Sequence, residues 1–485
     1  MRVTLNHENQ RLARGAWYGL LAQAVDKILP VAILLYLART LEQEDFGVYT
    51  FIIAYLAFFQ TATEYSIDTV LVRTMSQLPE KRNALLQAGL GLKLATAVLA
   101  ALLATLLAGP VSGGRAPLAM ALLASLGMVT AMGSAYRSWL RAQLRIGGVF
   151  GVAAGRALLL GGGVFVAVRV GMGLYAIFVA IAAANLVAFL GIALWFRRSV
   201  TPRARFERES WALLIRGALP LAGNAFAMTV SLRVGQILLM SMRGAVDVGM
   251  LAAASRVSEA FSLLPEALMI SVYPLMAGLH LNDLPRLLST AERSTRYLML
   301  ATGVPVVVCA VAGPEVMALL FGPSFADAGP ALSILVFMAL FSASGTVIIN
   351  LLVAAHREKV LYFNTMAFAA ASIPLSYALI SRGGYTGAAV AILVTSGLSQ
   401  AALALLPSTG LYVRSCLLAG VKPFAAAVAA SACGLVVGWT TATALVVALG
   451  VYAAALFALG VLDADELNFI RSLLGLRPNE PQERP

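Results

Sequence analysis

An arginine in the middle of an apolar segment is the residue of this chain that most directly suggests chemistry. Arg233 lies about halfway along the apolar run 217–240, and no acidic residue lies within one helical turn of it. A guanidinium group stays charged and donates hydrogen bonds in a fork that matches phosphate or pyrophosphate. A charge at membrane depth persists where it faces an aqueous cavity or meets a partner. We therefore interpret Arg233 as an oxyanion ligand; the alternative is an ion pair with Asp26, Glu64 or Asp68.

Other ionisable residues also fall inside apolar segments. Asp26 and Lys27 are adjacent, so on a helix their side chains point about 100° apart and pair poorly with each other. Either one of them faces a cavity while the other meets a neighbouring helix, or both form structural salt bridges between helices. Arg256 and Glu259 are three residues apart, which places them on one helix face and favours an internal ion pair over a ligand site.

A third set of charges lies closer to the predicted membrane surfaces. Lys93 and Arg156 could line an inner vestibule, but we expect both to extend toward the headgroups, and we expect the same of Asp68. Basic residues at the inner ends of apolar segments form a predicted cytoplasmic rim. Most of them need only satisfy the positive-inside rule, and they could also attract anionic lipid headgroups. This predicted rim contains Arg14, Arg137, Arg141, Arg145 and Arg216.

Several kinds of site are not predicted. The three histidines are isolated and the three cysteines are scattered, so we expect neither a metal site nor a disulfide framework. No glycine-rich phosphate loop precedes a Lys-Ser or Lys-Thr pair, and the loops are too short for a catalytic domain. The sequence therefore predicts a protein that is not an enzyme and has no cofactor. Its energy would come from an ion gradient or the membrane potential.

Membrane-spanning helices must position these charges. The chain has 485 residues, of which 60% are hydrophobic and only 12% are charged, too few charges for the surface of a soluble protein. Because one span needs roughly 20 apolar residues, we predict an all-α polytopic membrane protein with about fourteen transmembrane helices. The predicted spans are 15–37, 46–67, 84–108, 116–136, 147–168, 173–196, 217–240, 248–276, 297–313, 328–354, 360–380, 384–406, 421–439 and 441–461.

The distribution of positive charge predicts the orientation. The net charge of +12 does not indicate a nucleic-acid partner, because the basic residues form short clusters between apolar segments. With the N-terminus inside, most of the 35 Lys and Arg residues fall in predicted inner segments, as the positive-inside rule requires. We therefore expect a multi-pass protein of the cytoplasmic membrane with both termini in the cytoplasm.

The chain repeats itself at an offset of 202 residues. Gly47 recurs as Gly249 and Glu64 recurs as Glu266, and a later block that begins near Leu140 repeats at an offset of 212. Both copies begin on the inner side, which is typical of parallel repeats in transporters. The repeat predicts two six-helix bundles and an appended C-terminal helix pair. The predicted parts are an N-lobe 1–196, a basic cytoplasmic linker 197–216, a C-lobe 217–406, appended spans 407–462 and a cytoplasmic tail 463–485.

Several motifs resemble those of the bacterial polysaccharide flippase family, the exporters of O-antigen and exopolysaccharide repeat units. Residues 37–41 (LARTL) and 45–49 (DFGVY) resemble the family's first outer loop, and 64–73 resemble the end of its second helix. The second half adds 248–254 and 272–276, which fit the eighth span, and 354–357, which fit the end of the tenth. The resemblance covers roughly 12–410. The order and spacing of the motifs indicate the multidrug/oligosaccharidyl-lipid/polysaccharide (MOP) exporter superfamily.

The resemblance implies a V-shaped pair of helix bundles that works by alternating access. It implies that an oligosaccharide on undecaprenyl pyrophosphate moves from the cytoplasmic to the periplasmic leaflet. The implied cationic cavity would use Lys27, Arg233 and Arg256, with Asp26, Glu64, Glu259 and Glu266 as acidic partners or coupling groups. The family often has an acidic residue where this chain has Arg233, so cation coupling would need another group, for which Asp26 is the candidate.

The implied partners are the lipid bilayer, the polyprenyl-pyrophosphate-linked oligosaccharide and other polysaccharide assembly proteins, without nucleic acid. A cation-coupled multidrug antiporter of the same superfamily is the main alternative, and its cavity should be net acidic in order to receive cations. The predicted intramembrane charges do not decide between these two. A lipid II flippase is a third hypothesis. A membrane scaffold that transports nothing is a fourth, and it predicts that the intramembrane charges can be neutralised without effect.

Overall fold

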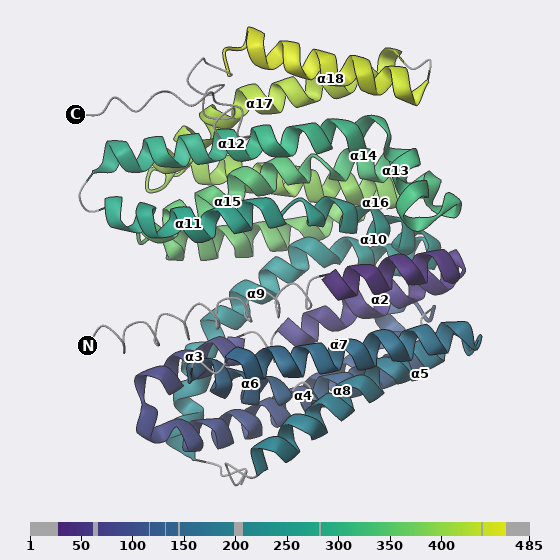
Figure 1. Cartoon of the computed structure of the whole chain (residues 1–485), viewed down its shortest axis with the longest axis vertical. Helices are drawn as coiled ribbons and strands as arrows, with labels where there is room; N and C mark the ends of the chain where they lie inside the picture. Colours follow the sequence, from purple (N-terminus) through teal and green to yellow (C-terminus); the bar gives the residue numbers. More distant parts are fainter. Residues whose placement is uncertain are drawn as a thin grey trace, which may run out of the picture. The chain divides into compact units, whose positions relative to one another are not determined.

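The computed structural model describes residues 28–61, 66–115, 117–130, 132–143, 146–197, 207–280, 283–437 and 440–461. In these ranges every regular element is a helix, so the all-α prediction is confirmed there (Figure 1). The first described helix is Ile28–Thr40. The α-helices that follow are α2 Gln43–Gln60, α3 Ser66–Gln77, α4 Arg82–Ser112, α5 Leu118–Thr130, α6 Gly133–Ala142, α7 Ile146–Arg169, α8 Gly173–Arg197, α9 Arg208–Met242, α10 Ala245–Ala260, α11 Leu263–Leu279, α12 Leu284–Val311, α13 Gly313–Phe321, α14 Gly329–Leu335, α15 Met338–Ala354, α16 Glu358–Leu405, α17 Gly410–Val437 and α18 Thr441–Ala458, with 3-10 turns η2 Pro79–Lys81 and η3 Pro323–Ala328.

Eleven helical stretches of the described residues are long and apolar enough to cross a membrane. The chain is a multi-pass membrane protein, whereas the number fourteen stays a prediction. The two predicted spans nearest the N-terminus, 15–37 and 46–67, include residues outside the described ranges. Two others, 360–380 and 384–406, belong to the one element α16, which is kinked at Gly384. The φ of Gly384 is +55°, in a region that L side chains rarely adopt.

The helix boundaries reproduce the repeat found in the sequence. α2 begins at Gln43 and α10 at Ala245, while α4 begins at Arg82 and α12 at Leu284, so both pairs are 202 residues apart. α6 ends at Ala142 and α15 at Ala354, an offset of 212. The additional residues therefore lie between α12 and α15, in the stretch that contains the turn η3.

The long helix α4 illustrates how composition produces these elements. Its buried face carries small residues four apart, among them Ala100, Ala104 and Ala108, which let neighbouring helices approach closely. The face that carries Leu99 and Leu102 is exposed, as a lipid-facing surface requires. The helix ends at Gly113, whose left-handed backbone satisfies the last carbonyl groups.

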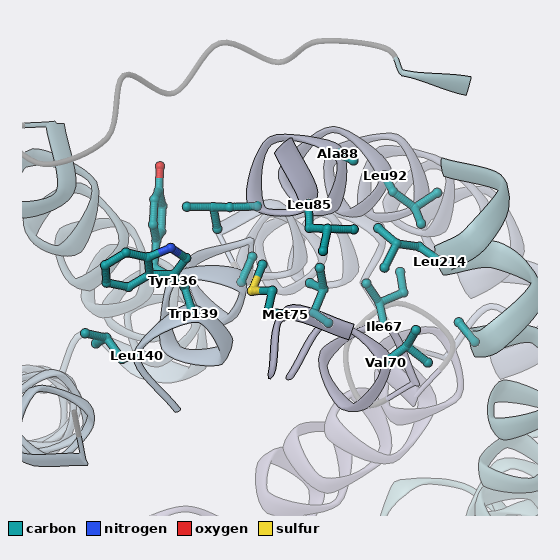
Figure 2. Close-up of a cluster of buried hydrophobic side chains, with 14 of the residues drawn as sticks. Ile67, Val70, Met75, Leu85, Ala88, Leu92, Tyr136, Trp139, Leu140 and Leu214 are labelled. Carbon is teal, nitrogen blue, oxygen red and sulfur yellow. The ribbon is translucent and has the colours of Figure 1, made fainter. Parts of the chain in front are cut away.

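Two compact units can be distinguished by their internal contacts. The first comprises the residues up to Ala253 together with 320–324 and 365–395. In this unit α4 packs on α5, α7 packs on α8, and α3 packs on α6 and α9. Figure 2 shows a cluster of its buried side chains, in which α3, α4, α6 and α9 all contribute apolar residues. Because α3 is fixed on several sides, its polar residues have defined positions.

Two glycines related by the repeat also meet in the first unit. A side chain at Gly47 would overlap the backbone carbonyl of Ala245 at the start of α10. A Cβ atom at Gly249 would lie 3.2 Å from Cδ1 of Phe46 and 3.3 Å from Cα of Gly47. The N-terminal turns of α2 and α10 therefore approach each other at two positions where the sequence supplies no side chain.

The second unit comprises 254–319, 325–364 and the residues from Ser396 onward. Within it α12 packs against α15, α17 and α18, and α17 packs against α18. Ser258 donates a hydrogen bond to the carbonyl oxygen of Leu335, and Ser333 donates one to that of Ala310. The appended helices α17 and α18 thus belong to the core of this unit. The predicted division at 1–196 and 217–406 stays a prediction.

Candidate functional site

A polar cavity of about 670 Å³ lies inside the first unit. This volume is in the range of small-molecule sites, roughly 300–1,000 Å³. Its wall is built by the helix Ile28–Thr40 and by α2, α3, α5, α6, α7 and α8. The polar residues of the lining are Gln60, Asp68, Thr69, Thr130, Ser134, Arg137, Ser138, Arg141, Arg156 and Asn185.

A buried ion pair forms one wall of this cavity. The Nζ atom of Lys93 on α4 lies 2.7 Å from Oδ1 of Asp68 on α3. The Lys93 side chain is 3% exposed and that of Asp68 is 20% exposed, so the carboxylate lies between the lysine and the cavity. Lys93 also donates to the hydroxyl of Ser134, and the Ser138 hydroxyl donates to Oδ1 of Asp68 over 3.0 Å. This polar cluster joins α3, α4 and α6.

The expectation that Lys93 and Asp68 extend toward the headgroups is therefore wrong. Two opposite charges on neighbouring helices satisfy each other, so neither side chain needs to leave the membrane interior. The pair survives burial because the serine hydroxyl groups supply additional hydrogen bonds, which offset part of the cost of desolvation.

Two arginines reach the cavity from α6. Arg137 and Arg141 are four residues apart, so they lie on the same face of the helix. The opposite face is fixed by aromatic packing on α8, where the ring of Phe196 lies 5.1 Å from that of Trp139 and 4.8 Å from that of Tyr136. Like charges at this spacing repel each other, so an anion between the two guanidinium groups would stabilise the helix.

A third arginine comes from α7. Nε of Arg156 donates a hydrogen bond of 2.8 Å to Oδ1 of Asn185 on α8. Both residues line the cavity and both are partly buried. Arg156 therefore does not extend toward the membrane surface as we expected; it takes the alternative role, in the wall of an inner vestibule. The amide of Asn185 orients the guanidinium group.

The charges of the lining favour an anion. Three arginines face one carboxylate, Asp68, and that carboxylate is already paired with Lys93. Bidentate hydrogen bonds from arginine match the geometry of a phosphate oxyanion. The described part of the cavity can therefore hold a phosphate, a pyrophosphate or an acidic sugar.

The residues that the sequence analysis predicted as a site do not all lie in this cavity. Arg141, predicted as part of the rim, is exposed and lines the cavity, and Arg216 is exposed near the beginning of α9. Arg233 is partly buried on α9 and does not belong to the lining. The remaining predicted residues, Asp26, Lys27, Glu64, Arg14 and Arg145, lie outside the described residues.

The internal ion pair on α10 is confirmed. NH1 of Arg256 lies 2.9 Å from Oε2 of Glu259. Glu266 is exposed in the first turn of α11. None of these three residues lines the cavity of the first unit. Sequence reasoning assigned too little weight to Arg137 and Arg156, although the spacing of Arg137 and Arg141 on one helix face was a usable signal.

Comparison with solved structures defines the fold. The chain is similar to the lipid II flippase MurJ in an inward closed conformation, with 12% identity and a TM-score of 0.70 over 94% of this chain and 99% of that one. It is also similar to a multidrug resistance MATE family transporter of the MOP superfamily, in an inward-facing conformation. That match has 13% identity and a TM-score of 0.63 and covers 84% of this chain and 98% of the other.

A third similar structure is a MOP superfamily transporter from Pyrococcus furiosus. It is 13% identical, with a TM-score of 0.54 over 86% of this chain and 96% of that one. The binding pocket of that transporter has reverse polarity, which suggests that the transporter has a different function. At these identities the likeness establishes that this chain has the fold of MOP transporters.

Comparison with sequence families gives a narrower result. No curated protein matches the chain significantly. A family model described as polysaccharide biosynthesis protein matches residues 12–280, more than half of the chain's 485 residues. The matched range includes all the helices that line the cavity. This chain belongs to the polysaccharide biosynthesis protein family.

Proposed function

We propose that this protein is a flippase for an oligosaccharide linked to undecaprenyl pyrophosphate. It would move this lipid from the cytoplasmic to the periplasmic leaflet of the bacterial inner membrane, for the synthesis of a surface polysaccharide. Both termini would lie in the cytoplasm, and an ion gradient or the membrane potential would supply the energy. The observation that carries the proposal is the cavity with three arginines and a neutralised carboxylate.

The chemistry of the cargo explains why its three parts would lie in different surroundings. A pyrophosphate is the part of a lipid-linked sugar that the membrane interior resists most strongly, because it carries concentrated negative charge. Arg137, Arg141 and Arg156 would replace its hydration shell with fixed donors. The sugar would occupy the aqueous space, and the prenyl chain would remain in lipid.

A drug antiporter fits the cavity less well. An acceptor of organic cations needs an unneutralised carboxylate or an excess of acidic groups at its site. Asp68 is the carboxylate among the described lining residues, and it is bound by Lys93 and Ser138. The polarity of the lining therefore favours an anionic cargo.

A lipid II flippase has the same kind of headgroup, so the cavity alone does not separate it from the proposed function. The family description, polysaccharide biosynthesis protein, favours an oligosaccharide repeat unit. Lys27, Arg233 and Arg256 remain candidates for further contacts along the transport path, and Asp26 remains the candidate coupling group.

The test is lipid extraction from a deletion strain, followed by mass spectrometry of the undecaprenyl-pyrophosphate glycans. We expect one complete repeat unit to accumulate, and we expect the intact gene to reverse the accumulation. A variant with both Arg137→Gln and Arg141→Gln should fail to reverse it. Arg169→Gln is the matched control, because Arg169 is exposed at the end of α7 and lies over the ring of Phe165.

Accumulation of lipid II in place of a repeat unit would indicate that the protein transports lipid II for peptidoglycan synthesis. Normal surface polysaccharide in the deletion strain, together with increased sensitivity to cationic dyes, would favour the antiporter. Full reversal by the well-expressed double arginine variant would contradict the role of the cavity.

A further inference from the structure

We propose that Lys93 determines the charge selectivity of the cavity, because it neutralises Asp68 and so prevents cations from binding there. Lys93 is not part of the cavity lining, whereas Asp68 is. The lysine lies behind the carboxylate, 3% exposed, at 2.7 Å from Oδ1. It would therefore act on a ligand through Asp68 and not by touching the ligand. This inference rests on the proposed function, since it specifies why that site accepts anions.

The polar surroundings hold Lys93 in this role. Its ammonium group donates to Ser134, and Ser138 donates to the same Asp68 oxygen that Lys93 contacts. Ser134 and Ser138 are both buried and lie on α6, the helix that also carries Arg137 and Arg141. The pair thus connects the neutralised carboxylate to the helix that supplies two of the three cationic groups.

The repeat supplies an independent argument. At an offset of 202 residues, the positions of Asp68 and Lys93 correspond to Ile270 and Thr295. The helices concerned are equivalent, since α3 ends at Gln77 and α11 at Leu279, and α4 and α12 begin at the same offset. Both charges are missing together from the second copy. The lysine and the acid thus occur together, as a neutralising role for Lys93 requires.

The net charge of the cavity predicts how the loss of Lys93 would change ligand binding. In the native protein the pair contributes no net charge and the three arginines remain, so the cavity attracts anions. Lys93→Gln would leave Asp68 as an unpaired carboxylate in the lining. Its negative charge would repel a pyrophosphate and attract an organic cation. A single charge at this range changes an affinity by about tenfold.

The experiment measures binding to the purified full-length protein in lipid nanodiscs, with inorganic pyrophosphate and ethidium as separate probes. We expect Lys93→Gln to bind ethidium about tenfold more tightly, and pyrophosphate about tenfold more weakly, than the native protein. The double variant Asp68→Asn with Lys93→Gln removes both charges, and we expect it to return both affinities to near the native values. Lys81→Gln is the matched control, because Lys81 is an exposed lysine just before α4.

Unchanged affinities for both probes in Lys93→Gln would overturn the inference. If Lys93→Gln does not fold, Asp68→Asn tests the inference in its place. This variant keeps the positive charge of Lys93 and removes the carboxylate, so pyrophosphate should bind at least as tightly as it binds to the native protein. Weaker pyrophosphate binding by Asp68→Asn would contradict the proposal. Failure of the native protein to bind pyrophosphate would contradict the proposed function instead, while the ethidium measurement on the variants would still test Lys93.

Discussion

The two copies of the repeat share several helix boundaries but differ in the chemistry that those helices carry. In the first copy the cavity-lining residues Arg137, Arg141 and Arg156 are basic. At an offset of 212 the corresponding residues are Ile349, Val353 and Phe368. The position of Asn185 corresponds to Gly397, and those of Asp68 and Lys93 correspond to Ile270 and Thr295.

This difference shows that the scaffold and the site follow separate requirements. Several equivalent helices begin or end at matching positions, such as α2 and α10 at their first residues and α6 and α15 at their last. Hydrogen bonds that serve only the helix also recur: Ser138 donates to the carbonyl oxygen of Ser134, and its counterpart Asn350 donates to that of Thr346. The three arginines of the cavity lining and the pair of Asp68 and Lys93 have no charged counterparts in the second copy. The polar lining of the cavity is therefore a feature of the first copy that the shared helix pattern does not require.

The largest expected effect is on the arginine pair. Replacing Arg137 and Arg141 by Gln should reduce transport by about 1,000-fold, since each hydrogen-bonded charged donor is worth about 1.5–3 kcal/mol. The measurement is flipping of the lipid-linked glycan in proteoliposomes. The matched change in the other copy, Ile349→Ala with Val353→Ala, should keep transport within about threefold. Equal losses in both variants would mean that α6 and its counterpart act only as scaffold.

The next effect concerns stability. Lys93→Met should lower the free energy of unfolding by about 3 kcal/mol, because it leaves a partly buried carboxylate without its cation. Thr295→Val, at the corresponding position, loses the hydrogen bond from the Thr295 hydroxyl to the Ala291 carbonyl and should cost about 1 kcal/mol. Thermal unfolding in detergent compares the two. A smaller loss for Lys93→Met would mean that the pair is structurally dispensable.

The two repeat-related glycines should also differ. Gly47→Ala would force a methyl group into the backbone of Ala245 and should destabilise the protein by about 3 kcal/mol. Gly249→Ala meets its neighbours at 3.2–3.4 Å and should cost about 1 kcal/mol, because small shifts can relieve it. Thermal unfolding of the two single variants tests this order. The reverse order would contradict the packing of α2 against α10.

The smallest expected effect is at Asn185. Asn185→Ala removes the acceptor that orients Arg156 and should weaken pyrophosphate binding by about fivefold, less than a loss of Arg156 itself. Titration of the purified protein with pyrophosphate measures it. Asn185→Asp should instead reduce binding more strongly, because it adds a negative charge to the lining. Unchanged pyrophosphate binding in both variants would show that Arg156 does not contribute to the binding site.

Sequence reasoning was sound where the controlling interactions are local. The ion pair of Arg256 and Glu259 was predicted from their spacing because residues three apart on a helix are neighbours, and the structure confirms it. Reasoning from the sequence was wrong about Lys93, because its acidic partner lies on a different helix. Nothing in the spacing of a single helix reveals which face of a neighbour will be opposite.

The sequence by itself determined that this is a multi-pass membrane protein whose described elements are helices and whose sequence contains a repeat. Apolar run length and the repeat offsets are properties of the chain alone, and the helix boundaries follow both. The tertiary structure decided where the charges go. It joined Asp68 to Lys93 and Arg156 to Asn185, and it brought Arg137 and Arg141 to the same cavity. The physical reason is that helix formation depends on neighbours along the chain, whereas a cavity and its charge depend on how separate helices pack.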